Sequence, residues 1–323
     1  MPPQKQKINP IANAPAKATV AIRNIAIVAA VETIIMYRLF AIFAIIAQLF
    51  FCACSSTDTN KKPKRVQSLS MAKMELFEIL DDQKALLESA KKHSLSEKSG
   101  ELADKYRKLD ARWNSYIDRY EDDLQAKILY GKFLRSIGED LPAYKIFLQV
   151  QSQNPNIAVV NQQLASYEGD CAMAEKALQH IKEAIRLDGE CAIYVYQYAE
   201  LLLALKEQYI VILNTSYGNL NKEITDSFKK AISLSQNNKQ IKKRFAESFF
   251  EKTDADWNNA LPAWNDYIKT CTLNIEKQTA LLGKARVLAE LYKDKEALQT
   301  LALVDLPQLK SERQRIENII KAK

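Results

Sequence analysis

Glycine, proline and histidine are scarce in this chain of 323 residues. Seven glycines and nine prolines, against many Ala, Leu, Lys, Glu and Gln residues, favour an almost purely helical protein. The sequence has neither a glycine-rich phosphate-binding loop nor a nucleophile elbow. These absences argue against the nucleotide-binding and hydrolase classes that such motifs identify.

The two histidines offer little for catalysis or metal binding. His93 falls in a polar segment expected to be a turn between helices, and His180 is expected on a helix surface. Neither lies near cysteines or carboxylates at a spacing that binds metals. The sequence therefore predicts no catalytic residue, no metal site and no cofactor.

The five cysteines stand at positions 52, 54, 171, 191 and 271. Cys171 and Cys191 are expected at opposite ends of one helix of about 14 residues, which separates them by roughly 20 Å. A disulfide needs Cα atoms within about 7 Å of each other. We therefore predict free thiols that are buried or partly buried.

The net charge of +7 comes largely from the N-terminus. Of the 46 basic and 39 acidic residues, five and one fall within residues 1–53, which leaves 41 and 38 from Cys54 onward. That remainder is an ordinary mixed surface, and no module of basic and aromatic residues is evident. A nucleic-acid partner is not expected.

The N-terminal residues contain an apolar segment. Residues 1–35 are expected to be disordered, or a non-native extension if the true start is Met36. Residues 36–53 have the anatomy of a signal peptide or membrane segment, with Arg38 before an apolar run over residues 39–51. This run is shorter than the about 20 residues of a transmembrane helix.

The end of this segment resembles the bacterial lipoprotein signal, in which a small residue precedes the cysteine that receives the lipid. Ala53 before Cys54 fits this rule, whereas Phe51 before Cys52 does not. The resemblance implies lipidation of Cys54, and Ser55 beside it is similar to the sorting pattern for the outer membrane. An uncleaved anchor and a plainly secreted protein are the alternatives.

Small residues recur along the chain at a spacing of 34 residues. Gly131, Ala165 and Ala199 are spaced in this way, as are Ala143 and Ala177. Such a period is typical of stacked pairs of antiparallel helices. The small residues are predicted where paired helices cross most closely, because a larger side chain there would push the helices apart.

Two segments share further residues at matching positions. They are Tyr130, Gly131, Leu134, Ala143, Phe147 and Pro155 in residues 124–157, and Leu164, Ala165, Ala177, Ile181 and Ala184 in residues 158–191. This pattern resembles the tetratricopeptide repeat (TPR) family. Lys127 and Asn161 stand where the family often has tryptophan, and Glu168 stands where it has an apolar residue.

The resemblance implies an all-α fold, an α-solenoid of antiparallel helix pairs in a TPR-like superhelix. It would hold about five repeats, an N-terminal helical hairpin and a C-terminal capping helix. Residues 54–68 are predicted to form a tether that is either solvated or attracted to anionic lipid headgroups. The hairpin is predicted at 69–121 and the cap at 309–323. The repeats lie within 124–308, at 124–157, 158–191, 192–238, 239–275 and 278–308.

The two helices of the hairpin are expected to pack through apolar stripes at spacings of three and four. The stripes comprise Met74, Phe77, Leu80 and Leu87 in the first helix, and Leu102, Tyr106, Leu109, Trp113, Tyr116, Ile117 and Tyr120 in the second.

The third repeat carries an insertion over residues 208–220. We expect it to extend the first helix of that repeat by about two turns. Its apolar end is either capped by neighbouring helices or offered to a partner.

The family resemblance also implies a groove lined by the first helix of each repeat. A mixed polar set with one aromatic could hold an extended peptide or a helix of another protein, with ordinary solvated positions as the alternative. By register, the lining would comprise Lys132, Arg135, Gln162, Ser166, Tyr196, Glu200, Lys243, Glu247 and Arg286.

Together these features predict a non-enzymatic scaffold or adaptor for proteins or peptides. We expect it in the bacterial cell envelope, on the periplasmic face and lipid-anchored to the outer membrane. The resemblance extends to lipoproteins of outer-membrane or secretion assembly. The alternatives are a glycan-binding protein or accessory to an envelope enzyme, and an inner-membrane protein anchored by residues 19–53.

Overall fold

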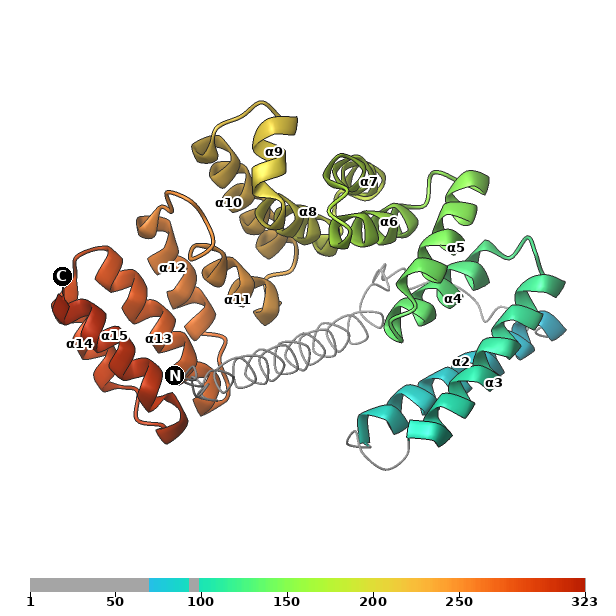
Figure 1. Ribbon diagram of the computed structural model, residues 1–323, viewed down its shortest axis with the longest axis horizontal. Helices are drawn as coiled ribbons and strands as arrows, with labels where there is room; N and C mark the ends of the chain where they lie inside the picture. The colour runs from blue at the N-terminus through green and yellow to red at the C-terminus, as the bar shows by residue number, and fades with distance from the viewer. Residues whose placement is uncertain (1–69, 93–98, 323) are drawn as a thin grey trace, which may run out of the picture. The chain divides into compact units, whose positions relative to one another are not determined.

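The computed structural model describes residues 70–92 and 99–322. Within these residues the chain forms fourteen α-helices, one short 3-10 helix and no strand (Figure 1), which confirms the all-α prediction. None of these helices is both long enough and apolar enough to cross a membrane. The predictions for residues 1–69, which include Cys54, and for His93 lie outside the described residues.

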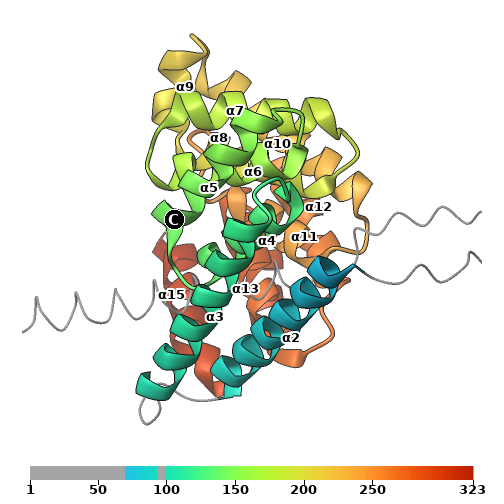
Figure 2. The ribbon, with the colours of Figure 1, turned by 90° about the vertical axis from the view of Figure 1, so that its right-hand side faces the viewer.

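Helices α2 (Met71–Lys92) and α3 (Ser99–Arg119) lie side by side as a hairpin (Figures 1 and 2). Helix α3 buries Leu109, Trp113 and Tyr116, and the exposed fraction of Trp113 is 0%. These residues are three or four positions apart, so they share one face of the helix. The predicted stripe of α3 is confirmed.

The buried side of α2 differs from the predicted one. Ile79 and Leu86 are buried, whereas Met74 and Phe77 are 49% and 56% exposed. The prediction is therefore wrong for Met74 and Phe77. Helix α2 carries apolar residues on more than one side, and the sequence of one helix does not show which side its partner covers.

Ion pairs from α3 lie along the buried side of α2. Arg112 pairs with Asp82, and Arg119 pairs with Glu75. Glu75 and Asp82 belong to the same helical stripe as Ile79. Exposed ion pairs contribute little free energy. The packing around Trp113 therefore holds the hairpin together, and the ion pairs add only a small preference for this side of α2.

The first two repeats are pairs of helices joined by short turns. Asp123 caps the first of these helices, because its Oδ1 accepts a hydrogen bond from the backbone N–H of Ala126 over 2.9 Å. Gly138, with φ of +85°, allows the turn between the two helices of the first repeat. The helices are α4 (Leu124–Ser136) with α5 (Asp140–Gln153), and α6 (Ala158–Asp170) with α7 (Ala174–Leu187).

Small residues lie where these helices approach each other most closely. A β-carbon on Gly131 would lie 2.8 Å from ring atoms of Phe147 in α5. Ala143, Ala165 and Ala177 are 0% exposed. A larger side chain at these positions would force the helices apart, as the 34-residue spacing predicts.

The third repeat contains a separate short helix, so the prediction of one extended first helix is wrong. Leu205, with φ of −112° and ψ of 28°, lies outside helical geometry and ends the first helix. Tyr209 is fully buried, and its hydroxyl donates a hydrogen bond to the carbonyl oxygen of Ala174 over 3.0 Å. This contact holds the short helix against α7. The helices are α8 (Ala192–Ala204), α9 (Lys206–Ile212) and α10 (Tyr217–Leu234).

The apolar end of the insertion is capped in part, and binding of a partner there stays a prediction. Tyr209 is capped by neighbouring helices, whereas Val211 and Ile212 are 78% and 41% exposed.

The last two repeats pack around large aromatic rings. Phe249, Trp264 and Tyr267 are buried between neighbouring helices. A β-carbon on Gly283 would come within 2.3 Å of the Trp264 ring, so the ring occupies the space that a side chain would need. The helices are α11 (Lys239–Ser248), α12 (Trp257–Ile268), α13 (Asn274–Glu290) and α14 (Asp294–Ala302).

The C-terminal end is covered by the 3-10 helix η1 (Pro307–Leu309) and by α15 (Lys310–Ala322). Helix α15 buries Ile316 and Ile320 and carries charged residues on its other side. A polar outer face is what the end of a helical stack requires.

Replacing Gly283 with Ala should destabilise the protein by about 1–3 kcal/mol, because the added β-carbon overlaps the buried ring of Trp264. The matched control is Gly218→Ala in α10, where the nearest atom is the Ser216 Oγ at 3.9 Å. The control should be neutral, or more stable by up to about 1 kcal/mol. Urea unfolding measures both, and equal losses would contradict the close-packing account.

Candidate functional site

The nine residues predicted for the groove lie on the first helices of the five repeats, which are α4, α6, α8, α11 and α13. We call the side of these helices that carries the nine residues the first-helix face. Within it, some side chains bind a neighbouring first helix and others do not. This division decides which groups can meet a partner.

Polar side chains link α4 to α6 and α6 to α8. Arg135 Nη2 lies 3.1 Å from the Asp170 Oδ2, and its Nη1 donates to the carbonyl oxygen of Gln163 over 3.4 Å. The amide of Gln162 donates to the amide oxygen of Gln197. Two of the predicted groove residues, Arg135 and Gln162, thus join consecutive repeats.

Ion pairs link α8 to α11 and α11 to α13 in the same way. Arg244 Nε lies 3.0 Å from the Glu200 Oε2, and Lys239 Nζ lies 2.7 Å from the Glu276 Oε1. Burial raises the pKa of Glu200, and the neighbouring Arg244 partly offsets the effect. We call the four contacts together the polar ladder: Arg135–Asp170, Gln162–Gln197, Arg244–Glu200 and Lys239–Glu276.

Sequence reasoning did not find the partners within the polar ladder. The Arg135–Asp170 and Gln162–Gln197 pairs are each 35 residues apart. A search for polar residues one position beyond the 34-residue period would have found both. The Arg244–Glu200 pair is 44 residues apart, because the insertion in the third repeat shifts the register.

The other predicted groove residues lie outside the polar ladder. Lys132 is half-buried and has no anionic partner among the described residues, and burial lowers its pKa. Lys243 lies 3.6 Å from the Glu247 Oε1. Tyr196 packs edge-on against Phe228, with ring centroids 6.0 Å apart.

Arg286 and Ser166 complete the set. The guanidinium carbon of Arg286 lies 4.0 Å from the ring centroid of Phe250, which is a cation–π contact. Ser166 is half-buried, and its hydroxyl has no hydrogen bond within the described part of the chain. The first-helix face therefore presents Lys132, Ser166, Tyr196, Lys243 and Arg286 beside the polar ladder.

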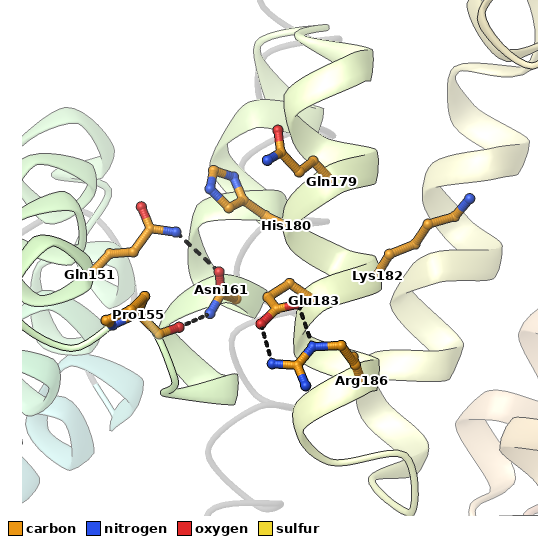
Figure 3. A pocket seen from close by; sticks show the side chains of 8 residues that line it. All are labelled: Gln151, Pro155, Asn161, Gln179, His180, Lys182, Glu183 and Arg186. Atoms are coloured by element: carbon orange, nitrogen blue, oxygen red, sulfur yellow. Dashed lines mark hydrogen bonds and ion pairs between the residues drawn. The ribbon is translucent and has the colours of Figure 1, made fainter.

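A second feature is an open depression of about 510 Å³ between α5 and α7 (Figure 3). Asn161 is 1% exposed and lies in its floor, where it donates to the carbonyl oxygen of Pro155 and accepts from Gln151, both over 3.0 Å. Glu183 and Arg186 pair at its edge over 2.7 Å. Figure 3 shows Lys182 pointing away from these groups.

The lining residue His180 belongs to a buried hydrogen-bond network. Its Nδ1 lies 2.6 Å from the Oε2 of Glu168, which is 0% exposed. The hydroxyl of Tyr144 donates to the other carboxylate oxygen over 3.0 Å, and burial together with this carboxylate raises the pKa of Tyr144 to about 12. The side chain of His180 is 16% exposed, so the prediction of a surface position is wrong, because the pairing of α6 with α7 brings His180 against the buried Glu168.

This network does not have the parts of a nucleophilic site. Within the described residues, no hydrogen bond joins His180 to a serine, threonine or cysteine side chain, and no group of histidines, cysteines and carboxylates could hold a metal. A catalytic base of this kind acts on a neighbouring nucleophile. The arrangement gives the buried carboxylate of Glu168 hydrogen-bond partners from Tyr144 and His180.

The described cysteines are free thiols, as predicted. Cys191 is buried and Cys271 is partly buried, but Cys171 is exposed. The prediction of burial is wrong for Cys171 because this residue ends α6 in the turn before α7, outside the packed faces of both helices.

Solved structures with the same arrangement of helices include YrrB, a TPR protein with an unusual peptide-binding site. YrrB is 14% identical to this chain with a TM-score of 0.51, and the match covers 64% of this chain and 97% of YrrB. The pilF protein of Pseudomonas aeruginosa is 12% identical with a TM-score of 0.50, and the match covers 76% of this chain and 98% of pilF. The fold is that of a TPR solenoid.

The TPR fold does not by itself assign a function, because the same fold can carry different sites. No family model matches the sequence, and no curated protein matches it at a significant level. A function for this chain therefore depends on the residues of its first-helix face.

Replacing Glu168 with Ala should destabilise the protein by about 1–3 kcal/mol, because Tyr144 and His180 then lose a hydrogen-bond partner inside the stack. The matched control is Glu175→Ala on the exposed surface of α7, which should change the free energy of unfolding by less than about 0.5 kcal/mol. Denaturant unfolding compares the two. A loss at Glu168 no larger than at Glu175 would show that the network contributes nothing.

Proposed function

We propose that this protein is a non-enzymatic scaffold that binds a segment of another protein along the first-helix face. The observation that carries the proposal is the division of that face into two sets of polar groups. The polar ladder satisfies one set by joining consecutive repeats. The second set lies beside the ladder and outside it, and one of its members, Arg286, stacks on Phe250 of the preceding repeat.

The polar ladder supports binding because it holds the first helices in register before a partner arrives. A surface that is already ordered loses little conformational entropy on association. Tyr196 adds a large, rigid contact group of the kind that dominates protein interfaces. The peptide-binding site of YrrB, which shares the fold, is consistent with the same use here.

A photo-crosslinking amino acid at Ser166 tests the proposal. A probe on the first-helix face should link the protein to a partner segment, whereas the same probe at Lys176, exposed on the second helix α7, should not. Tyr196→Ala should reduce the yield at Ser166 by about tenfold, because loss of a central aromatic contact costs about 1–2 kcal/mol. Equal yields from both probes, or none at Ser166, would contradict binding at this face.

We further propose that Cys54 is lipidated and anchors the scaffold in the envelope, on the periplasmic side of the outer membrane. Support comes from the sequence, in which an apolar segment ends at Ala53 directly before Cys54. A role in outer-membrane or secretion assembly would suit a tethered scaffold. Anchoring in the inner membrane by residues 19–53 is the competing arrangement.

Metabolic labelling with a fatty acid separates these arrangements. Cys54→Ala should lose the label and leave the membrane fraction, since a cysteine at the cleavage site is the acceptor of the lipid. The matched control Cys52→Ala should keep both the label and the membrane location. An unlabelled wild-type chain that retains residues 36–53 by intact mass would replace the lipid anchor with a membrane segment.

A further inference from the structure

The basic residues of the repeats gather on the first helices. Helices α4, α6, α8, α11 and α13 carry ten basic and six acidic residues in total. The second helices α5, α7, α10, α12 and α14 carry eight of each. The first helices therefore hold the whole charge excess of these ten helices.

The excess of basic over acidic residues lies in two parts of the repeat array, one at α4 and the other at α11 and α13. Helix α4 has three basic residues and no acidic residue. Helix α11 has four basic residues and one acidic residue, and the next first helix, α13, has three basic and two acidic residues. Helices α6 and α8, which lie between them in the order of the repeats, have no basic residue. On the first-helix face these two helices present the uncharged residues Gln162, Ser166 and Tyr196. The carboxylate on this part of the face, Glu200, is paired with Arg244.

Lys132 marks the first basic place. Its ammonium is half-buried, and no carboxylate pairs with it in the part of the chain that the structure describes. An ammonium that has lost part of its hydration gains more from a carboxylate than a fully hydrated one does. The other cation of α4 on this face, Arg135, is already paired with Asp170 over 3.1 Å.

Lys243 and Arg286 mark the second basic place. Lys243 is exposed, and its contact with Glu247 is long at 3.6 Å. Arg286 lies 4.0 Å from the Phe250 ring centroid, and its positive charge contributes to the lowered pKa of Glu312, after the larger effect of Arg315. A guanidinium on a ring can still bind a carboxylate, because it has five N–H donors. Neither residue belongs to the polar ladder.

From this distribution we infer that the bound segment is acidic, with two clusters of Asp or Glu side chains separated by an uncharged stretch. The inference rests on the proposed function and names its partner chemistry. One cluster pairs with Lys132, the other pairs with Lys243 and Arg286, and the uncharged stretch crosses α6 and α8. Charge complementarity of this kind also speeds association and makes it dependent on salt.

The length of the uncharged stretch follows from helix spacing. Three steps between neighbouring first helices, at the about 10 Å typical of packed helices, make about 30 Å. An extended chain advances about 3.3 Å per residue, so the two acidic clusters should be about nine residues apart.

Synthetic peptides test the inference with the full chain. The probe has two clusters of glutamates about nine uncharged residues apart, with an amidated C-terminus so that a terminal carboxylate plays no part. Comparison peptides replace the glutamates with lysines or glutamines. Fluorescence anisotropy should show binding of the acidic peptide alone, with an affinity that falls as salt is added.

Matched charge reversals locate the binding. Lys132→Glu and Lys243→Glu should each weaken binding of the acidic peptide by about tenfold or more. Lys145→Glu, on the exposed surface of the second helix α5, makes the same charge change and should leave the affinity within about twofold. Circular dichroism confirms that the variants are folded, and Lys243 serves where the half-buried Lys132 position does not tolerate glutamate.

Three results would contradict the inference that the bound segment is acidic. The first is an equal loss of affinity in Lys145→Glu, which would mean attraction to net charge alone. The second is tighter binding of single-stranded DNA or anionic vesicles than of the acidic peptide. The third is a partner that crosslinks at Ser166 equally well in the wild type and in both charge variants, which would leave the scaffold standing and its partner not acidic. Absence of any crosslink at Ser166 would instead count against the proposed function itself.

Discussion

The stack of helices depends on close contact between a small residue on one helix and an aromatic ring on its partner. At Gly131 and Phe147, and again at Gly283 and Trp264, the ring fills the space that a side chain would occupy. Helices that approach so closely bury nearly all of the surface between them, and dense packing resists any change of volume. The positions of α4 against α5 and of α13 against α12 follow from these contacts.

Polar contacts between repeats become possible once the helices are placed in this way. The polar ladder joins side chains from helices that are far apart in sequence, such as Glu200 and Arg244. Buried polar groups need partners, so the ladder uses part of the first-helix face to hold the repeats in register. What remains, including Lys132 and Tyr196, is a set of groups outside the polar ladder.

The sequence predicts the helical repeats well because periodicity reports local packing. The sequence predicts individual contacts between helices less well where more than one face of a helix is apolar and could be buried. Helix α2 has apolar residues on two sides, and α3 covers Ile79 rather than Phe77. The insertion reads as one long helix, yet the buried contact of Tyr209 with α7 favours a break at Leu205. In both cases the outcome depends on a partner that lies elsewhere in the chain.

The sequence by itself determined the all-α architecture, the 34-residue period and the positions of the small residues, because these follow from helix propensity and from the spacing of apolar side chains. It also placed on first helices the nine residues predicted for a groove. Only the tertiary structure decided which of them bind neighbouring repeats, and only it brought His180 to the buried Glu168. Such contacts join residues whose spacing in the sequence carries no signal, since they arise when separate helices are packed together.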